Sequence, residues 1–180
     1  MPKNVLVVVD MQNDFITGTL GSSEAQAVVS RIVDHINANN VDYDLIVFTM
    51  DAHMDKAYPF TLEGKKIPIK HCIWGSEGAD LHPEMKKIYD SLHNSRRALL
   101  RKNSFTCTDL PFIKPIIEPA NRVDFCGVCT DICVVSTAMY LRTHQPNLQI
   151  RVLRDCCAGT TPEMHEAALK VMKSCCMDIV

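Results

Sequence analysis

The chain has 180 residues, a length that suits one domain with a full hydrophobic core. Apolar residues make up 47% and charged residues 22%, values close to the globular average that exclude long disordered stretches. The net charge is −2 and the basic residues are scattered, which excludes the basic footprint of a nucleic-acid-binding protein.

The N-terminal apolar run covers residues 5–9 and ends at Asp10. It is too short for the core of a signal peptide or for a membrane span, and no other apolar stretch reaches spanning length. The chain contains nine Cys, an odd number that argues against a disulfide framework. We therefore expect a cytoplasmic protein without membrane contacts, in which most thiols pack as small buried hydrophobic groups.

Apolar runs rich in β-branched residues alternate with helical patterns along the chain. We predict strands at 5–9, 45–50, 97–101, 122–127, 148–153 and 177–180. We predict helices at about 23–39, 83–92, 130–143 and 162–174, the last of them with Thr161 as N-cap and Pro162 in its first turn. Strands that alternate with helices indicate βαβ units, and hence an α/β fold with a parallel sheet.

No repeat, low-complexity tract or linker divides the chain, so we expect a single domain over residues 1–180. The Pro-containing segment 111–119 retains apolar residues and is predicted to be an ordered connection. Residues 51–82 show no clear helix or strand period. A long irregular stretch inside a compact domain is usually functional, which directs attention to this segment.

Polar side chains follow four of the predicted strands. Asp10 follows the first strand, Asp51 and His53 follow the second, Lys102 follows the third, and a Cys cluster follows the fourth. Each residue taken alone is explained by a helix cap, a turn or the solvated surface. In an open α/β sheet, however, ligands bind outside the carboxyl ends of the strands. Convergence at that edge favours a functional site.

The Cys cluster lies in the sequence CGVCTDICVV, residues 126–135. Cys126 and Cys129 form a C-x-x-C pair, which would suit a redox pair or half of a zinc site. The other candidate pairs are adjacent doublets, which suit tetrahedral chelation poorly, and a thioredoxin-like motif should follow the first strand of its fold. Cys126 belongs to the predicted strand and is expected to pack in the core.

Cys133 falls in the first turn of the helix predicted after the fourth strand, where Thr130 or Asp131 can cap the helix. A helix N-terminus stabilises a thiolate, and its free N–H groups face any oxyanion that forms there. Asp10 would accept the thiol proton, and Lys102 would hold that carboxylate and lower the pKa of the thiol. A thiolate nucleophile, a base and N–H donors for an oxyanion together suit acyl transfer.

A metal site is the second hypothesis. Asp51 and His53 form a D-x-H pair at a strand end, where residues two apart share one side of an extended chain. His71 would return from the irregular segment. Two imidazoles and one carboxylate suit Zn²⁺, Fe²⁺ or Mn²⁺ with positions left open for water. The alternative is a set of ordinary polar loop residues.

Five segments carry a family resemblance, in the family's order and with similar spacing. The chain resembles the cysteine hydrolases of the nicotinamidase and isochorismatase superfamily through VVVDMQNDF, TMDAH, KHCIWGSEGADLHPE, RKNSF and GVCTDICV. The resemblance implies a Rossmann-like, three-layer sandwich with a six-stranded parallel sheet. It also implies an Asp–Lys–Cys triad, here Asp10, Lys102 and Cys133. A cis peptide before Cys129 and an oxyanion hole from the Cys129 and Cys133 amides complete the implied machinery.

Within the superfamily, D-x-H together with H-C-x-x-G-[ST]-x-G is similar to the nicotinamidases, whose metal holds the pyridine nitrogen of the substrate. The resemblance therefore implies one divalent transition-metal ion on Asp51, His53 and His71, with zinc preferred over iron or manganese. Some nicotinamidases carry another His shortly after D-x-H, whereas here the segment MDKAYPF offers none. Phe15 matches the aromatic residue that covers a flat ring, and we also assign Trp74 to the substrate pocket.

The expected activity is a metal-assisted hydrolysis of nicotinamide, or a close aromatic amide, to the acid and ammonia through a thioester. The partners are a small-molecule amide and further copies of the chain in a homo-oligomer. One alternative is another hydrolase of the family that acts on a different small amide, a carbamoyl compound or a vinyl ether. An alternative of another class is a non-enzymatic thiol or metal sensor.

Overall fold

The computed structural model describes residues 3–107 and 120–180, so the connection expected at 111–119 lies outside the described residues. The described chain forms one six-stranded sheet in the order β3-β2-β1-β4-β5-β6, and every neighbouring pair is parallel. This confirms the predicted α/β fold. The strands are β1 Lys3–Val9, β2 Leu45–Asp51, β3 Arg97–Lys102, β4 Ala120–Val128, β5 Gln149–Ala158 and β6 Asp178–Ile179.

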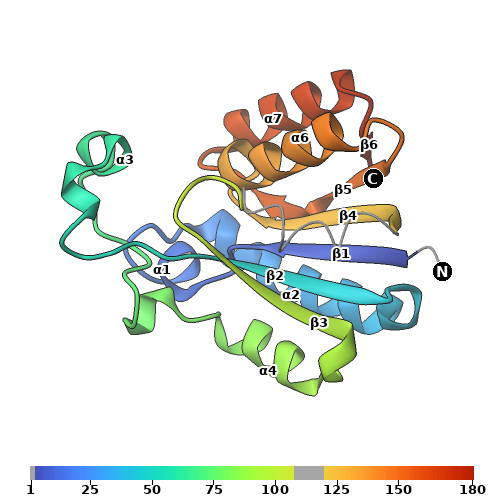
Figure 1. Ribbon diagram of the computed structural model, residues 1–180, viewed down its shortest axis with the longest axis horizontal. Coiled ribbons are helices and arrows are strands. Elements are labelled where there is room, and N and C mark those ends of the chain that lie inside the picture. The colour runs from blue at the N-terminus through green and yellow to red at the C-terminus, as the bar shows by residue number, and fades with distance from the viewer. Residues whose placement is uncertain (1–2, 108–119) are drawn as a thin grey trace.

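Within the described part of the chain, four longer helices cover the sheet, two on each face, and give the three layers seen in Figure 1. One face carries α2 Ser23–Asn39 and α4 Pro83–Ser91, and the other carries α6 Val135–His144 and α7 Pro162–Ser174. The central strand β1 is buried on both faces. Leu6 and Val8 pack into one core, and Val5, Val7 and Val9 pack into the other. This two-sided burial explains the continuous apolar run in the sequence.

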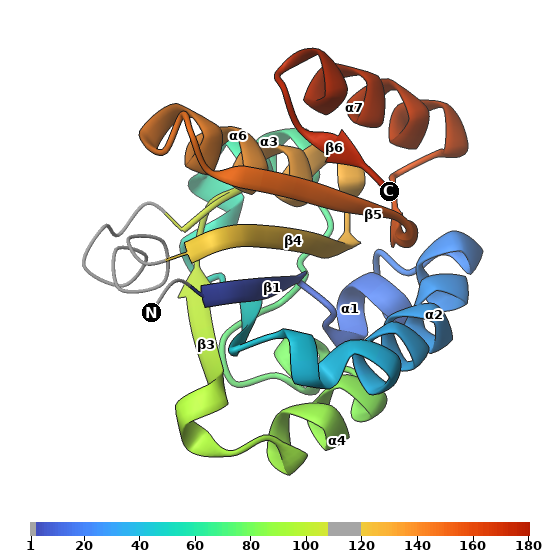
Figure 2. The same ribbon diagram turned by 90° about the vertical axis from the view of Figure 1, so that its right-hand side faces the viewer.

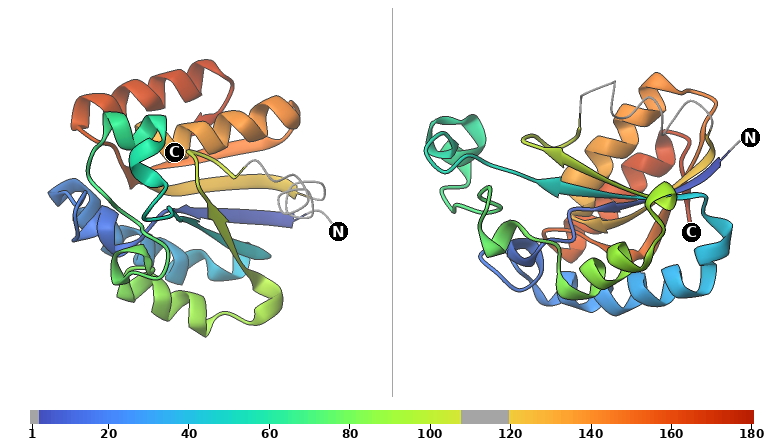
Figure 3. Two further views of the ribbon diagram at one scale, coloured as in Figure 1. Left: turned by 60° about the vertical axis from the view of Figure 1, so that its left-hand side comes forward. Right: turned by 60° about the horizontal axis from the view of Figure 1, so that its bottom comes forward.

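Shorter elements fill the connections. They comprise α1 Asn13–Ile16, α3 Leu62–Lys66, and 3₁₀ turns at Asn40–Asp42, Tyr58–Phe60, Glu77–Ala79 and Asn94–Arg96. The long segment between β2 and α4, predicted to be irregular, contains several of these turns, and α3 stands away from the sheet in Figure 1 and in the right-hand view of Figure 3. The helix predicted at 130–143 opens instead with a π-helical turn, Thr130–Val134. The predicted N-cap is confirmed, because Thr161 accepts a hydrogen bond from the Met164 amide.

The order of the strands indicates where on the sheet a ligand would bind. From β1 the chain builds outward through β2 to β3, then returns to the other side of β1 and builds outward through β4 to β6. This reversal beside β1 is a topological switch point, where open α/β sheets bind their ligands. Figure 2 shows β1 and β4 side by side at the centre of the sheet. Within residues 3–107 and 120–180, none of the helices has the length and apolar character that crossing a bilayer requires.

Candidate active site

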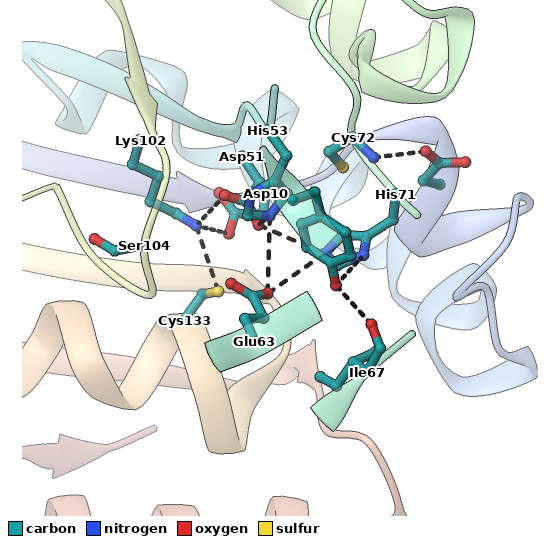
Figure 4. Close-up of polar contacts among 12 residues, drawn as sticks. Asp10, Asp51, His53, Glu63, Ile67, His71, Cys72, Lys102, Ser104 and Cys133 are labelled. Atoms are coloured by element: carbon teal, nitrogen blue, oxygen red, sulfur yellow. Dashed lines mark hydrogen bonds and ion pairs between the residues drawn. The ribbon is translucent and has the colours of Figure 1, made fainter. Parts of the chain in front are cut away.

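The three predicted catalytic residues meet at the carboxyl edge of the sheet (Figure 4). Lys102 ends β3, and its Nζ lies 2.7 Å from Asp10 Oδ2 and 3.5 Å from Cys133 Sγ. Asp10 directly follows β1, and its Oδ1 accepts a 2.7 Å hydrogen bond from the Thr49 hydroxyl. All three side chains are buried. The arrangement places an ammonium between a carboxylate and a thiol in a site shielded from water.

The electrostatics of this group differ from the sequence-based expectation. Burial, followed by the Asp10 carboxylate, raises the pKa of Cys133 well above its ordinary value, and Lys102 lowers it by less. Lys102 acts on the pKa of the thiol in the predicted direction, but burial and Asp10 outweigh it. Burial alone would lower the pKa of Lys102, but Asp10, Cys133 and Asp51 outweigh it and raise that pKa. In the free protein the proton stays on sulfur and the ammonium stays charged.

A glycine near the end of β4 lets the turn that carries Cys133, Thr130–Val134, lie close to β1. We call this segment the nucleophile turn. Gly127 lies beside Val9 in the sheet register and has φ +115°. A Cβ at this position would stand 2.1 Å from the Val9 carbonyl oxygen, a contact that any other residue would have to relieve by moving a strand. The absence of a side chain therefore permits β4 to deliver its carboxyl end next to Asp10.

The backbone then turns sharply into the π-helical segment. The peptide bond between Val128 and Cys129 is cis, as the resemblance implied. The Cys129 carbonyl accepts hydrogen bonds from the Ile132 and Val134 amides, at 3.1 Å each. Cys133 lies in the first turn after β4, as predicted, and Cys126 packs in the core.

The predicted cap is wrong, because neither candidate side chain caps the turn. Both reach neighbouring elements instead. Thr130 Oγ1 lies 2.8 Å from His165 Nδ1. The Asp131 carboxylate accepts hydrogen bonds from the Thr160 amide and hydroxyl, at 2.8 and 2.6 Å. Asp131 thus ties the nucleophile turn to the loop after β5.

The predicted metal ligands also converge, and a fourth residue joins them. The donor atoms of Asp51, His53, Glu63 and His71 all lie within 4.8 Å of one another. His53 Nε2 lies 3.2 Å from Asp51 Oδ2 and 3.7 Å from Glu63 Oε1, and His71 Nε2 lies 3.6 Å from Glu63 Oε1. Ligand atoms about 2.1 Å from a tetrahedral zinc ion stand about 3.4 Å apart. The spacing and the donor types fit a divalent transition metal.

The tautomer and charge of the donor set support this fit. His71 Nδ1 lies 3.0 Å from the Ile69 carbonyl oxygen, so Nδ1 carries the proton and Nε2 is left as a donor for a metal. Burial lowers the pKa of His71, but its contacts with Glu63, the Ile69 carbonyl and Asp51 outweigh burial and raise it. The cluster thus has the negative field that a cation requires. Asp51 Oδ1 is buried and accepts no hydrogen bond from the residues that the structure describes, although Lys102 Nζ lies 3.5 Å away.

Glu63 was not predicted from the sequence, which suggested three protein ligands. It lies in the first turn of α3, whose N-cap Thr61 accepts a hydrogen bond from the Gly64 amide. Tyr58 stabilises the segment around α3 by donating a hydrogen bond to the Ile67 carbonyl. The one available signal was a capped acidic residue in a helical turn, ten positions after His53, within an otherwise irregular segment. Since α3 stands away from the sheet, no strand-end rule could place it.

A cavity of about 190 Å³ connects the thiol of the Asp–Lys–Cys group with the metal donors. Its lining includes Cys133 and Cys129 on one part and metal donors on another, with apolar walls from Phe15, Leu20, Ile67, Phe105, Val128 and Ile132. An apolar cavity of about 150 Å³ can hold benzene, so this one suits a single ring with a small substituent. Phe15 also packs against the imidazole of His71, with ring centroids 5.4 Å apart.

Trp74 is the one predicted site residue that the structure places elsewhere. Its side chain is 57% exposed, and it borders a separate surface hollow with the Arg101 guanidinium 4.9 Å from its ring. The residue follows His71 closely in sequence, but its indole faces outward, and the next residue, Gly75, has φ +82°. This position argues against a direct contact between Trp74 and a substrate at Cys133.

Comparison with known proteins agrees with this geometry. The Isochorismatase domain matches residues 4–180. The chain is 29% identical to a nicotinamidase/pyrazinamidase of Mycobacterium tuberculosis, with 97% of each chain covered. A nicotinamidase structure from Bacillus subtilis matches with a TM-score of 0.84 at 26% identity, and a Pyrococcus horikoshii pyrazinamidase in complex with zinc matches at 0.80 and 26%, each with 99% of both chains covered. The resemblance seen in the motifs is confirmed, and the chain belongs to the isochorismatase family.

Proposed function

We propose that this protein, an amidohydrolase of the isochorismatase family that acts on C–N bonds, converts nicotinamide or a close aromatic amide to the acid and ammonia. The observation that carries the proposal is one ring-sized cavity lined both by the thiol of an Asp–Lys–Cys group and by metal donors. The M. tuberculosis and B. subtilis relatives named above support an aromatic amide as the substrate.

The proposed reaction begins with a proton transfer. Asp10 accepts the Cys133 proton, and the sulfur attacks the amide carbon of the substrate. The amides of Cys129 and Cys133 stabilise the oxyanion. The C–N bond then breaks, and ammonia leaves with the proton returned by Asp10, so that an acyl thioester remains on Cys133. Water, deprotonated by Asp10, cleaves this thioester, and the proton goes back to sulfur as the acid leaves.

Lys102 holds the Asp10 carboxylate in place between these steps, because its ammonium lies 2.7 Å from Asp10 Oδ2. When bound at Asp51, His53, Glu63 and His71, a divalent ion would supply a Lewis-acid position for a ring nitrogen, with zinc favoured by the donor set. Phe15 would cover the face of the ring. Assembly as a homo-oligomer, a cytoplasmic location and a single domain over residues 1–180 remain predictions.

Ammonia release tests the function directly. We expect release from nicotinamide and pyrazinamide, and much slower release from benzamide, which lacks the ring nitrogen. Cys133→Ala should lower kcat by at least about 10³-fold, because it removes the sulfur on which the proposed thioester forms. Cys126→Ala is the matched control, since that thiol is 1% exposed and packs in the core. It should cost stability and leave kcat nearly unchanged. Turnover by Cys133→Ala, or no ammonia from any of these amides, would refute the proposal.

Metal content tests the donor set. The purified protein should contain about one transition-metal ion per chain, and both His53→Ala and Glu63→Gln should weaken binding by at least about tenfold. Glu77→Gln provides the control, since Glu77 is an exposed acid in the same segment. Equilibrium dialysis followed by elemental analysis gives the affinity. Wild-type affinity in Glu63→Gln would restore the three-ligand site that the sequence suggested.

A further inference from the structure

Gln12 makes three buried hydrogen bonds beside the active site, and the reaction described above does not use it. Its side chain is fully buried. Nε2 donates to the Asp51 carbonyl at 2.8 Å and to the Ala79 carbonyl at 2.7 Å, and Oε1 accepts from the Asp51 amide at 2.7 Å. Because two partners are acceptors and one is a donor, a single amide orientation satisfies all three.

These bonds extend the sheet at the point where β1 leaves it. The β1–β2 register ends at Val8 and Phe48, and the Asp10 amide then reaches the Thr49 carbonyl at 3.2 Å. Asp10 has φ +49°, so the main chain turns away, and among residues 3–107 and 120–180 no strand pairs with Asp51 on this side. The primary amide of Gln12 replaces the missing peptide group there, donating to the Asp51 carbonyl and accepting from its N–H as a paired strand would.

Asp51 is therefore held from both sides. On its other flank it is in register with Lys102 of β3, and the next amide, Ala52 N–H, donates to the Lys102 carbonyl at 2.8 Å. The Asp51 carboxylate faces Lys102 Nζ at 3.5 Å and His53 Nε2 at 3.2 Å. A change of even a few tenths of an ångström in the Asp51 backbone would alter both contacts, so its main-chain partners control the donor set.

We propose that Gln12 is a positioning residue that sets the Asp51 carboxylate for metal binding and links the metal donors to the turn that carries Asp10. This role rests on the proposed metal centre. Partners that orient a metal ligand typically account for 10- to 100-fold in metal affinity. The hydrogen bond from Gln12 to the Ala79 carbonyl also connects this group to the 3₁₀ turn Glu77–Ala79, which follows His71 in the chain.

Cobalt binding tests the proposal without relying on turnover. Cobalt(II) affinity is measured by competition with a chelator, and the d–d absorption band reports the geometry of the ligands. Gln12→Met keeps the length of the side chain and removes all three hydrogen bonds, so we expect an affinity 10- to 100-fold lower and an altered band. Gln12→Glu keeps an oxygen for the Asp51 amide and loses the NH₂ group, and it serves if Gln12→Met folds poorly.

Two controls separate positioning from general stability. Gln26→Met makes the same substitution at an exposed position of α2. Ile36→Val destabilises the core, since Ile36 is 2% exposed, without touching the site. Both controls should retain wild-type cobalt affinity and the wild-type band, even where Tm falls. A folded Gln12 variant with wild-type affinity and spectrum would overturn the role of Gln12 alone. A wild-type protein that binds no cobalt would refute the metal centre and this role with it.

Discussion

Cys133 lies among charged side chains that act on its thiol in opposite directions. Burial is the largest effect and raises the pKa of the thiol, Asp10 and Asp51 raise it further, and Lys102 lowers it. The helix start alone does not produce a free thiolate. The free protein therefore holds a protonated nucleophile beside its base, and deprotonation belongs to the step in which the substrate is attacked.

These opposed effects predict opposite results for two variants. Lys102→Met removes the charge that favours the thiolate, so the pKa of Cys133 should rise and alkylation by iodoacetamide should slow, by about tenfold for each pKa unit. Asp10→Asn removes the neighbouring negative charge, so alkylation should become faster. Rates are measured against pH on chelator-treated protein, with peptide mass mapping to follow Cys133 among the nine thiols. Shifts of the same sign in both variants would contradict this account.

The buried Asp124 carboxylate connects β4 and β5 to the loop after α2. Asp124 is fully buried and in register with Arg151, whose Nε and Nη2 donate to it at 2.8 and 2.6 Å. Tyr43 donates to the same carboxylate at 2.7 Å, and Arg122 Nε lies 3.2 Å away. The two strands and the loop after α2 thus share one charge.

Asp124→Asn should lower the free energy of unfolding by about 2–4 kcal/mol, because a neutral amide leaves the arginines uncompensated and turns donors toward donors. Urea unfolding followed by circular dichroism measures the change. Asp155→Asn on the same β5 strand is the control, since Asp155 is exposed, and it should stay within about 0.5 kcal/mol of wild type. A loss below 1 kcal/mol in Asp124→Asn would mean that the arginines find sufficient solvation elsewhere.

A comparison of the predicted strands and helices with the observed ones shows which parts of the site the sequence could predict. β1 and β2 were predicted to within two residues, because strands buried on both faces appear in the sequence as continuous apolar runs. The edge strand β3 is only partly buried, yet its short apolar stretch also predicted it to within two residues. Asp10, Asp51 and Lys102 mark the polar ends of these three strands. The π-helical turn was not predicted, since its apolar spacing resembles that of an α-helix. Glu63 was missed because it lies in α3, outside the sheet, and the outward position of Trp74 lies in the same irregular segment, where no strand end fixes the side chains. Strand ends are predictable by rule, whereas loop geometry is set by tertiary contacts.

Over the whole molecule, three partly buried histidines make stability depend on pH. His35 in α2, His82 at the start of α4 and His165 in α7 all have lowered pKa values, and desolvation by burial is the largest cause in each. They lie in different helices on both faces of the sheet. His71 opposes them, since its pKa is raised in the metal-free protein.

The surroundings of His35 explain why its pKa is lowered. The Tyr43 hydroxyl gives its proton to Asp124, so it accepts a hydrogen bond from His35 Nε2–H at 2.8 Å. His35 Nδ1 then faces the amide nitrogen of Asn39 at 3.5 Å as an acceptor. Protonation would direct a second N–H at this NH₂ group and place a positive charge in a partly buried site, and this desolvation is the largest cause of the lowered pKa of His35. The Asp124 carboxylate raises that pKa, but burial together with Arg151 and Arg122 outweighs it.

The sign of the pH dependence follows from linkage. In the unfolded chain these histidines titrate near 6.5, whereas in the folded protein they titrate lower, so the unfolded state binds more protons as pH falls below about 6.5. The urea midpoint of chelator-treated protein should therefore hold above pH 7 and fall as pH decreases toward 5. His35→Gln, which keeps a donor for Tyr43 and cannot titrate, should make this fall shallower, whereas His144→Gln at an exposed position should leave it unchanged. A midpoint that rises between pH 7 and 5, or a His35→Gln slope equal to that of wild type, would show that the buried histidines do not control acid stability.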